Sequence, residues 1–195
     1  GGLIINGYAP LTSGQKTANT EINNEYPYGG DKADDNSGSI EYLILEYCGA
    51  AQNDDVEHNT LTLNGVGSGT KISNVFAYMG AADEDQSDFV MKNITIELAQ
   101  KPSEEKGRIL DDVFKVRRGA TATIENALVK GQGKAKDFID AHDGKGDGKL
   151  TISYNNQLTS PITGKPVSDE GDVTATEDKS LTGCDPSLFA WTGYK

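Results

Sequence analysis

The chain repeats a pattern, first at Lys71-Ile72-Ser73-Asn74-Val75-Phe76-Ala77-Tyr78 and again at Thr123-Ile124-Glu125-Asn126-Ala127-Leu128-Val129-Lys130. In both stretches an isoleucine is followed two positions later by an asparagine and then by small or apolar residues. Ile124 follows Ile72 by 52 residues, which predicts two units of a repeat near 26 residues. A unit of this size cannot bury its apolar face alone, so stacked units that share a core are expected.

Short runs of strand-forming residues recur along the rest of the chain. Each run has four to ten residues, is rich in Ile, Val, Leu, Tyr and Thr, and is bounded by Gly, Asn or Asp, which is typical of β-strands. The runs are Leu3–Asn6, Ile40–Tyr47, Leu61–Val66, Ile72–Met79, Phe89–Leu98, Val113–Val116, Ala122–Val129, Phe138–Ala141 and Leu150–Tyr154. Ser39–Leu45 fits the frame of the repeat, and Lys92–Ile96 echoes it with a shift. Asn74, Asn93 and Asn126 are expected to stack as an inward asparagine ladder.

The segments between the runs predict loops. Acidic loops are expected at Asp31–Gly38, Gln52–Asn59, Ala81–Asp88 and Asp140–Gly148, and the charged stretch Pro102–Leu110 is expected to be an insertion loop. No window carries a sustained helical stripe, so the fold class is all-β. We expect residues 1–154 to form parallel β-helix coils and residues 155–195 to form an irregular, loop-rich C-terminal cap. In that cap Leu188–Trp191 would return to cover the last coil.

Composition excludes two classes of protein. The chain has 195 residues and a formal net charge of −12, which disfavours binding to nucleic acid because phosphate backbones would be repelled. No stretch approaches the roughly 18 apolar residues of a transmembrane span. Two cysteines, Cys48 and Cys184, are too few for a disulfide scaffold, and the sequence does not show whether they pair.

Three further stretches carry a resemblance to a known group of proteins. They are residues 1–10, residues 28–49 and the string Leu61-Thr62-Leu63-Asn64-Gly65-Val66-Gly67-Ser68-Gly69-Thr70. Together they resemble the secreted or cell-surface right-handed parallel β-helix repeat proteins of bacteria, many of them lipoproteins of unassigned function. The resemblance implies a right-handed β-helix and a secreted, periplasmic or outer-surface location, and it brings no catalytic residues with it.

The chain departs from that group in two places. Its members usually continue with further coil upstream of the position of Gly1, which suggests a fragment, a short relative or an open end that docks on another chain. They also tend to carry an acidic-aromatic Gly-Gly turn where this chain has Ala81-Ala82-Asp83-Glu84-Asp85. A site that depends on that turn is therefore in doubt here.

Basic and aromatic side chains are the candidates for ligand binding. Lys115 and Arg117 alternate onto one face of their strand and could grip the carboxylate of an acidic sugar. Tyr42, Tyr47 and Tyr78 could serve as sugar platforms on a flat face.

Acidic residues are the candidates for a calcium site. Asp143 and Asp147 follow part of a calcium-loop pattern, although Lys145 occupies one ligand position, and Asp83 and Asp85 could add oxygens from another loop. Calcium is the one cofactor that this pattern suggests.

Three functions remain open at this point. The first is a non-catalytic exported surface protein that binds glycan, matrix or a partner protein through a flat face. The second is a polysaccharide lyase or glycoside hydrolase that uses carboxylates from neighbouring coils. The third is a structural protein that self-associates end to end into a fibre. A β-helix can host all of them, so the fold does not choose.

Overall fold

A computed structural model describes residues 2–11, 13–22, 24–48, 59–78, 82–85, 88–98, 110–142, 144 and 146–193, with the backbone alone at 82–85 and 110–111. Almost all of its regular structure is strand, in the order β1 (Leu3–Asn6), β2 (Ala18–Asn19), β3 (Pro27–Tyr28), β4 (Ser39–Glu46), β5 (Leu61–Asn64), β6 (Lys71–Tyr78), β7 (Ala82–Asp85), β8 (Asp88–Leu98), β9 (Leu110–Arg117), β10 (Thr121–Gly131), β11 (Ala135–Asp140), β12 (Lys149–Leu158) and β13 (Asp172–Glu177). A 3-10 helix, η1 (Pro186–Thr192), follows. None of the described helical residues forms a segment long and apolar enough to span a membrane.

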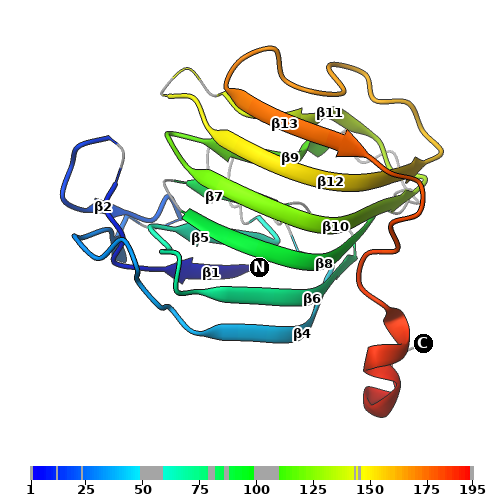
Figure 1. Ribbon diagram of the computed structural model, residues 1–195, viewed down its shortest axis with the longest axis horizontal. Coiled ribbons are helices and arrows are strands. Elements are labelled where there is room, and N and C mark those ends of the chain that lie inside the picture. The colour runs from blue at the N-terminus through cyan, green and yellow to red at the C-terminus, as the bar shows by residue number, and fades with distance from the viewer. Residues whose placement is uncertain are drawn as a thin grey trace.

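Two parallel sheets form the body of the described chain. Sheet A has the order β1-β5-β7-β9-β11 and sheet C the order β13-β12-β10-β8-β6-β4, so from β4 to β12 successive strands alternate between the two sheets (Figure 1). The predicted repeat is confirmed by register: Ile72 pairs with Met91, and Met91 pairs with Ile124. The spacing is uneven, since Val90 follows its partner Lys71 by 19 residues and Thr121 follows Asp88 by 33.

The hydrophobic core lies between the two sheets. Its largest buried side chains include Leu63 and Phe114 from sheet A and Ile72, Met91 and Ile124 from sheet C. Phe114, Phe138 and Tyr154 form an aromatic row in this core, with ring centroids 5.8 and 5.0 Å apart. The predicted strand runs lie within a few residues of the observed strands. The predictions were made from apolar residues, and each sheet buries one apolar face.

A column of left-handed residues crosses sheet C at one level. The equivalent positions in β4, β6, β8 and β10 are Tyr42, Asn74, Asn93 and Asn126, with φ of 60°, 55°, 56° and 58°. Asparagine tolerates this conformation better than most residues. The amides form a ladder, in which Asn93 Nδ2 donates to Asn74 Oδ1 at 3.2 Å and Asn126 Nδ2 to Asn93 Oδ1 at 2.9 Å.

The predicted asparagine ladder is therefore confirmed, but its inward orientation is wrong. The residues two positions before and one position after each asparagine, such as Ile124 and Ala127, point into the core, while the amides lie half-buried on the outer face of sheet C. The stretch around Asn93 also fits the repeat without the expected shift, because Met91 takes the place of isoleucine.

The segment 178–193, here called the strap, crosses the outer face of sheet C toward its lower edge (Figure 1). Asn126 Oδ1 accepts hydrogen bonds from the amides of Thr182 and Gly183, and its Nδ2 donates to the carbonyl of Gly183. Thr95 Oγ1 accepts from the amide of Cys184 at 2.9 Å. A Cβ at residue 183 would lie 2.3 Å from Thr95 Oγ1, so glycine is required there.

The strap ends in a small apolar cluster of its own. Phe189 of η1 packs with Phe76 and Cys184, and Ile44 and Tyr78 border them. Both Cys48 and Cys184 are free thiols, and burial, aided by the charge of Asp185, raises the pKa of Cys184 to about 11. The thiol of Cys184 thus stays neutral and acts as a packing group.

Three expectations need correction. Ala82–Asp85, expected as part of an acidic loop, forms β7 between β5 and β9. Residues 172–177, expected as loop, form β13 beside β12. Leu188–Trp191 does not cover the last strand pair but packs on β6, near the opposite edge of sheet C. The division at residue 154 stays a prediction, and most of Pro102–Leu110 lies outside the described residues.

Asn126 should contribute more to stability than Asn74, because it alone joins the ladder to the strap. Replacing Asn126 with Ala removes four hydrogen bonds, whereas Asn74→Ala removes one ladder bond and carries the same backbone penalty. We expect Asn126→Ala to lower the free energy of unfolding by about 2 kcal/mol more than Asn74→Ala, as measured by urea titration. Equal losses would show that the strap adds nothing.

Candidate functional site

The outer face of sheet A collects the polar positions that the sequence singled out. Two rows of paired positions run across its strands: Thr62, Asp83, Lys115 and Asp140 in one, and Asn6, Asn64, Asp85 and Arg117 in the other. The predicted ligand-binding residues Lys115 and Arg117 thus lie beside the positions of two predicted calcium ligands on the neighbouring strand. Only the backbone of β7 is described, so the register places Asp83 and Asp85 without showing their side chains.

Lys115 links two carboxylates on this face. Its Nζ lies 2.8 Å from Asp112 Oδ2 and 3.0 Å from Asp140 Oδ2. Burial disfavours the charged lysine, but hydrogen bonds to Asp112 and Asp140 outweigh it and raise the pKa of Lys115. Burial also raises the pKa of Asp112, whose Oδ1 is buried without a hydrogen-bond partner among the described residues. The cluster is held together, but at a cost in desolvation.

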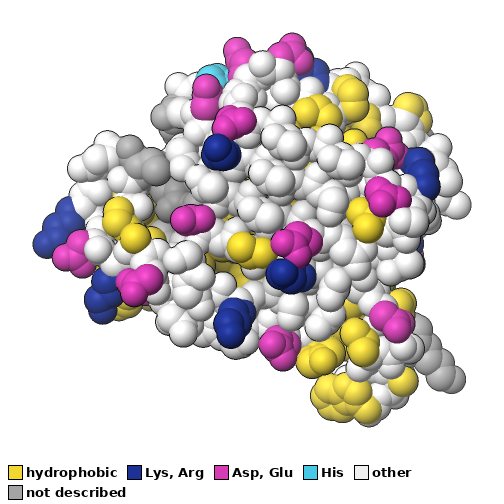
Figure 2. All heavy atoms as spheres, in the orientation of Figure 1, with side chains coloured by type: hydrophobic (Ala, Val, Ile, Leu, Met, Phe, Trp, Pro, Cys, Tyr) yellow, Lys and Arg dark blue, Asp and Glu magenta, His cyan; other side chains and the backbone are white. Residues whose placement is uncertain are grey.

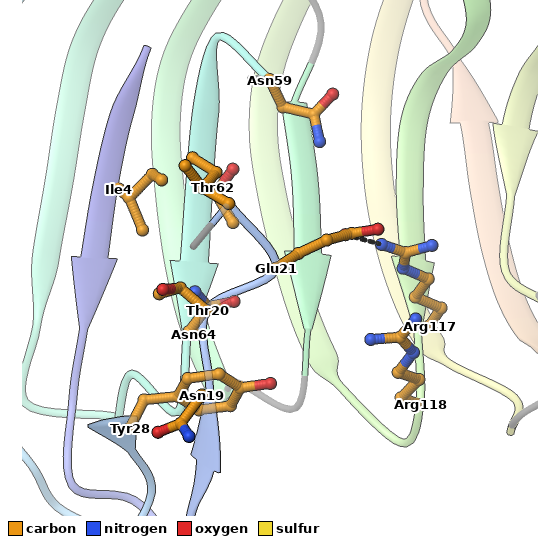
Figure 3. A pocket seen from close by; sticks show the side chains of 11 residues that line it. Ile4, Asn19, Thr20, Glu21, Tyr28, Asn59, Thr62, Asn64, Arg117 and Arg118 are labelled. Carbon is orange, nitrogen blue, oxygen red and sulfur yellow. Dashed lines mark ion pairs between the residues drawn. The ribbon is translucent and has the colours of Figure 1, made fainter. Parts of the chain in front are cut away.

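A small, open pocket lies beside this cluster, between sheet A and the short antiparallel hairpin β2–β3 (Figure 3). Arg117 and Arg118 line one side of it. Glu21, Ile4 and Ile22 also line the pocket, and the other lining residues carry amides, hydroxyls and a phenol: Asn19, Thr20, Tyr28, Asn59, Thr62 and Asn64. The amide, hydroxyl and phenol groups can donate hydrogen bonds, which suits an oxygen-rich ligand.

Arg117 meets the hairpin through one acidic side chain. Its Nη2 lies 3.8 Å from Oε2 of Glu21, which reaches across the pocket from the turn after β2 (Figure 3). The arginine side chain is 14% exposed and the glutamate side chain 55%. The pair is therefore a weak one with a well-solvated partner.

Backbone hydrogen bonds join Arg118 and Gly119 to the turn after β11. The amide of Arg118 donates to the carbonyl of Gly146 at 3.0 Å, and the amide of Gly119 donates to that of Asp147 at 2.8 Å. A φ of 54° at Arg118 turns the chain sharply at the end of β9. This geometry directs two consecutive arginines toward one pocket, although strand alternation alone would separate them.

The predicted calcium ligands are not gathered in the part of the chain that is described. Asp147 Oδ1 contacts His142 Nδ1 at 2.6 Å, and that hydrogen bond is the main reason that the pKa of His142 is raised. The side chains of Asp83 and Asp85, and all of Asp143, lie outside the described residues. Among described residues no group of three His, Cys, Asp or Glu side chains is placed to hold a metal ion.

The three tyrosines lie far from the arginines in the fold. Tyr42 belongs to β4 and Tyr78 to β6 of sheet C, and Tyr47 follows β4 directly. Tyr47 and Tyr78 pack edge to face with centroids 5.4 Å apart. Tyr78 borders the apolar cluster of the strap, and Leu188 and Trp191 of η1 are exposed; Figure 2 shows hydrophobic side chains gathered at the lower right. The predicted binding set is thus divided between two sheets.

Comparison with known proteins bears on the first part of the chain. Residues 1–86 match the model of the pectate-lyase-like β-helix domain. The match spans β1 to β7, and together with the two parallel sheets it supports a β-helix family for this protein. No curated protein and no solved structure gave a match.

Sequence reasoning missed the hairpin side of the pocket. Its strands have two residues each, too short for any periodic pattern, and Glu21 meets Arg117 across 96 positions of sequence. The one usable signal was Tyr28-Gly29-Gly30, because these glycines lie tightly against the chain after β1. Gly29 donates its amide to the carbonyl of Gly7 at 2.8 Å and fixes the base of the hairpin.

Asp112 should make stability depend on pH in a way that its neighbour does not. Because the pKa of Asp112 is higher in the folded than in the unfolded state, the folded protein binds more protons between the two values. The free energy of unfolding should therefore fall as pH rises through that acidic window. We expect Asp112→Asn to flatten this fall in urea titrations from pH 3 to 7.

Asp140→Asn provides the control, since the variant removes a bond to the same lysine and leaves Asp112 in place. It should lower stability by roughly 1 kcal/mol at pH 7 and keep the acid slope. An unchanged slope in Asp112→Asn would contradict the assignment.

Proposed function

We propose that this protein is a non-catalytic β-helix domain that binds a carboxylated glycan in the pocket between hairpin β2–β3 and sheet A. The observation that carries the proposal is the pair Arg117 and Arg118 at one open pocket. A guanidinium presents parallel N–H donors that match both oxygens of a carboxylate. Two guanidiniums in one pocket favour a ligand with more than one carboxylate.

The remaining lining of the pocket supports a sugar rather than another anion. Asn19 offers an amide and Thr62 a hydroxyl that can pair with sugar hydroxyls, whereas Asn64 Nδ2 already donates to Asn6 Oδ1 at 3.0 Å. The phenol of Tyr28 adds an aromatic surface at the base of the hairpin. The matching family model is named for its likeness to pectate lyase, and pectate is a polymer of carboxylated sugars.

The proposal extends to the architecture and the location of the protein. We take the alternating strands to wind as a right-handed solenoid on an exported bacterial surface protein, so that the pocket faces the surroundings of the cell. The family match and the two in-register parallel sheets support the solenoid. Open edges at β4 and β13 are compatible with end-to-end association.

One observation favours an enzyme as the second candidate. Asp112 and Asp140 share Lys115 a short distance along β9 from the pocket, and a carboxyl group with a raised pKa is suited to donate a proton. The same experiment separates the two functions, because only an enzyme shortens the ligand.

Calorimetric titration with trigalacturonate tests the binding function. We expect binding by the unaltered protein, an affinity about tenfold lower for Arg117→Ala and for Arg118→Ala, and no binding of a neutral galactose trimer. Lys149→Ala is the matched control, since its charge pairs with Asp172 on sheet C. Equal affinities for the charged and neutral trimers would refute the proposal, and shortened products after long incubation would favour the enzyme.

Calcium binding can be measured on the same samples. The proposed ligands are Asp83, Asp85, Asp143 and Asp147, and hard oxygen donors of this kind bind calcium in the micromolar to millimolar range. Titration with calcium chloride should give heat that is lost in Asp83→Asn and Asp85→Asn together. Retention of the full heat in that double variant would exclude β7 from the site.

A further inference from the structure

We infer that the surface of sheet C beneath the strap is a peptide-binding site whose partner in trans is the strap of a second copy of this chain. This surface, here called the strap site, consists of Asn155, Asn126, Thr95 and Phe76, one each from β12, β10, β8 and β6. Figure 1 shows the strap running down past these strands before it ends in η1. The glycan pocket proposed above lies on sheet A, so the two sites are separate.

The strap site binds the main chain of the strap with one polar side chain from each of three neighbouring strands. Asn155 Nδ2 donates to the carbonyls of Lys179 and Leu181 at 3.0 and 2.8 Å. Asn126 and Thr95 bind the main chain further along the strap. Any chain segment of suitable shape carries such main-chain groups, including a segment that belongs to another molecule.

Two side-chain positions make the strap site selective. At residue 183 a Cβ would lie 2.3 Å from Thr95 Oγ1 and 2.7 Å from the carbonyl oxygen of Ile94, so a bound segment must carry glycine there. Six residues after that glycine, Phe189 is 2% exposed and packs with Phe76. A glycine followed at this interval by a phenylalanine is therefore the chemistry that the strap site recognises.

The strap is joined to the rest of the chain by an exposed connection. Residues 178–180 are exposed and follow β13 directly, whereas Gly183, Cys184 and Phe189 are the buried residues of the strap. Asn155 Oδ1, on the amide that binds the start of the strap, is buried and accepts no hydrogen bond from the described residues. The strap of the same chain thus leaves one acceptor of the strap site unsatisfied next to the connection.

A second copy can supply the same contacts without a new interface. The groups that hold Gly183, Cys184 and Phe189 lie on β10, β8 and β6, and an identical strap from another molecule would meet all of them. Exchange of an identical segment between copies is a low-cost route to a dimer. The attached strap has an effective concentration on the order of millimolar, so in dilute solution it occupies its own site. Exchange becomes measurable when that strap is weakened.

Binding of a labelled peptide of residues 178–193 to the full chain tests the strap site. Gly183→Ala in the chain should unseat its own strap, because the added Cβ overlaps Thr95 Oγ1. We therefore expect this variant to bind the peptide at least about tenfold more tightly than the unaltered protein does, as measured by fluorescence anisotropy. The matched peptide that carries Gly183→Ala should bind at least about tenfold more weakly than the unaltered peptide. Equal binding of the two peptides would overturn the inference.

A second pair of reagents covers the case in which the Gly183→Ala chain does not fold. Phe189 belongs to the small apolar cluster of the strap and not to the main core, so Phe189→Ala leaves the main core intact. The Phe189→Ala chain should bind the unaltered peptide and discriminate against a peptide that carries Phe189→Ala. Loss of that discrimination would count against the strap site in the same way.

Mixing two full-length variants tests the second copy as the partner. The Gly183→Ala chain has an open strap site and a strap that cannot seat, while a Thr95→Tyr chain has a blocked site and an unaltered strap. We expect sedimentation velocity to show a mixed dimer when both chains are present and a monomer for each alone, at concentrations above the Kd of the peptide. A monomeric mixture, or dimers of either variant alone, would overturn exchange of the strap between copies.

Discussion

In-register stacking of parallel strands is the constraint on which the rest of this molecule depends. The left-handed residues Asn74, Asn93 and Asn126 interrupt their strands at the same level, so the stacked strands of sheet C share one irregularity. The column ends where β12 has one residue fewer, at Ser153, whose hydroxyl accepts the amide of Asn126. The side chain of Asn126 is then available to bind the strap.

The two sheets use their outer faces differently. Sheet C hides part of its outer face beneath the strap, where Thr95 and Asn155 bind the strap backbone much as a receptor binds an extended peptide. Sheet A leaves a pocket open beneath a hairpin and lines it with basic side chains. Because the protein carries a net charge of −12, binding of the proposed anionic ligand would depend on contact with the two arginines rather than on long-range steering.

Features that depend on the burial of apolar side chains within one strand could be predicted from the sequence. Features that depend on contacts between distant segments of the chain could not. The equivalence of Ile72 and Ile124, which each pair with Met91 on the strand between them, could be predicted because both side chains face the shared core. The acidic segment Ala82–Asp85 carries no strand preference and becomes β7 through pairing on both sides. Lys115 and Arg117 could be assigned to one face of a strand. Glu21, the acidic partner of Arg117, could not be identified, since nothing local relates the two residues.

The strap follows every strand that it covers in the order of the chain. Phe76 and Thr95 are therefore synthesised about 90 to 110 residues before Phe189 and Cys184 arrive to shield them. During that interval the outer face of sheet C around Phe76 and Thr95 is uncovered on the ribosome-bound chain. The strap thus docks only after the strands beneath it have been made, and the period before it docks is when unrelated chains can adhere to that surface.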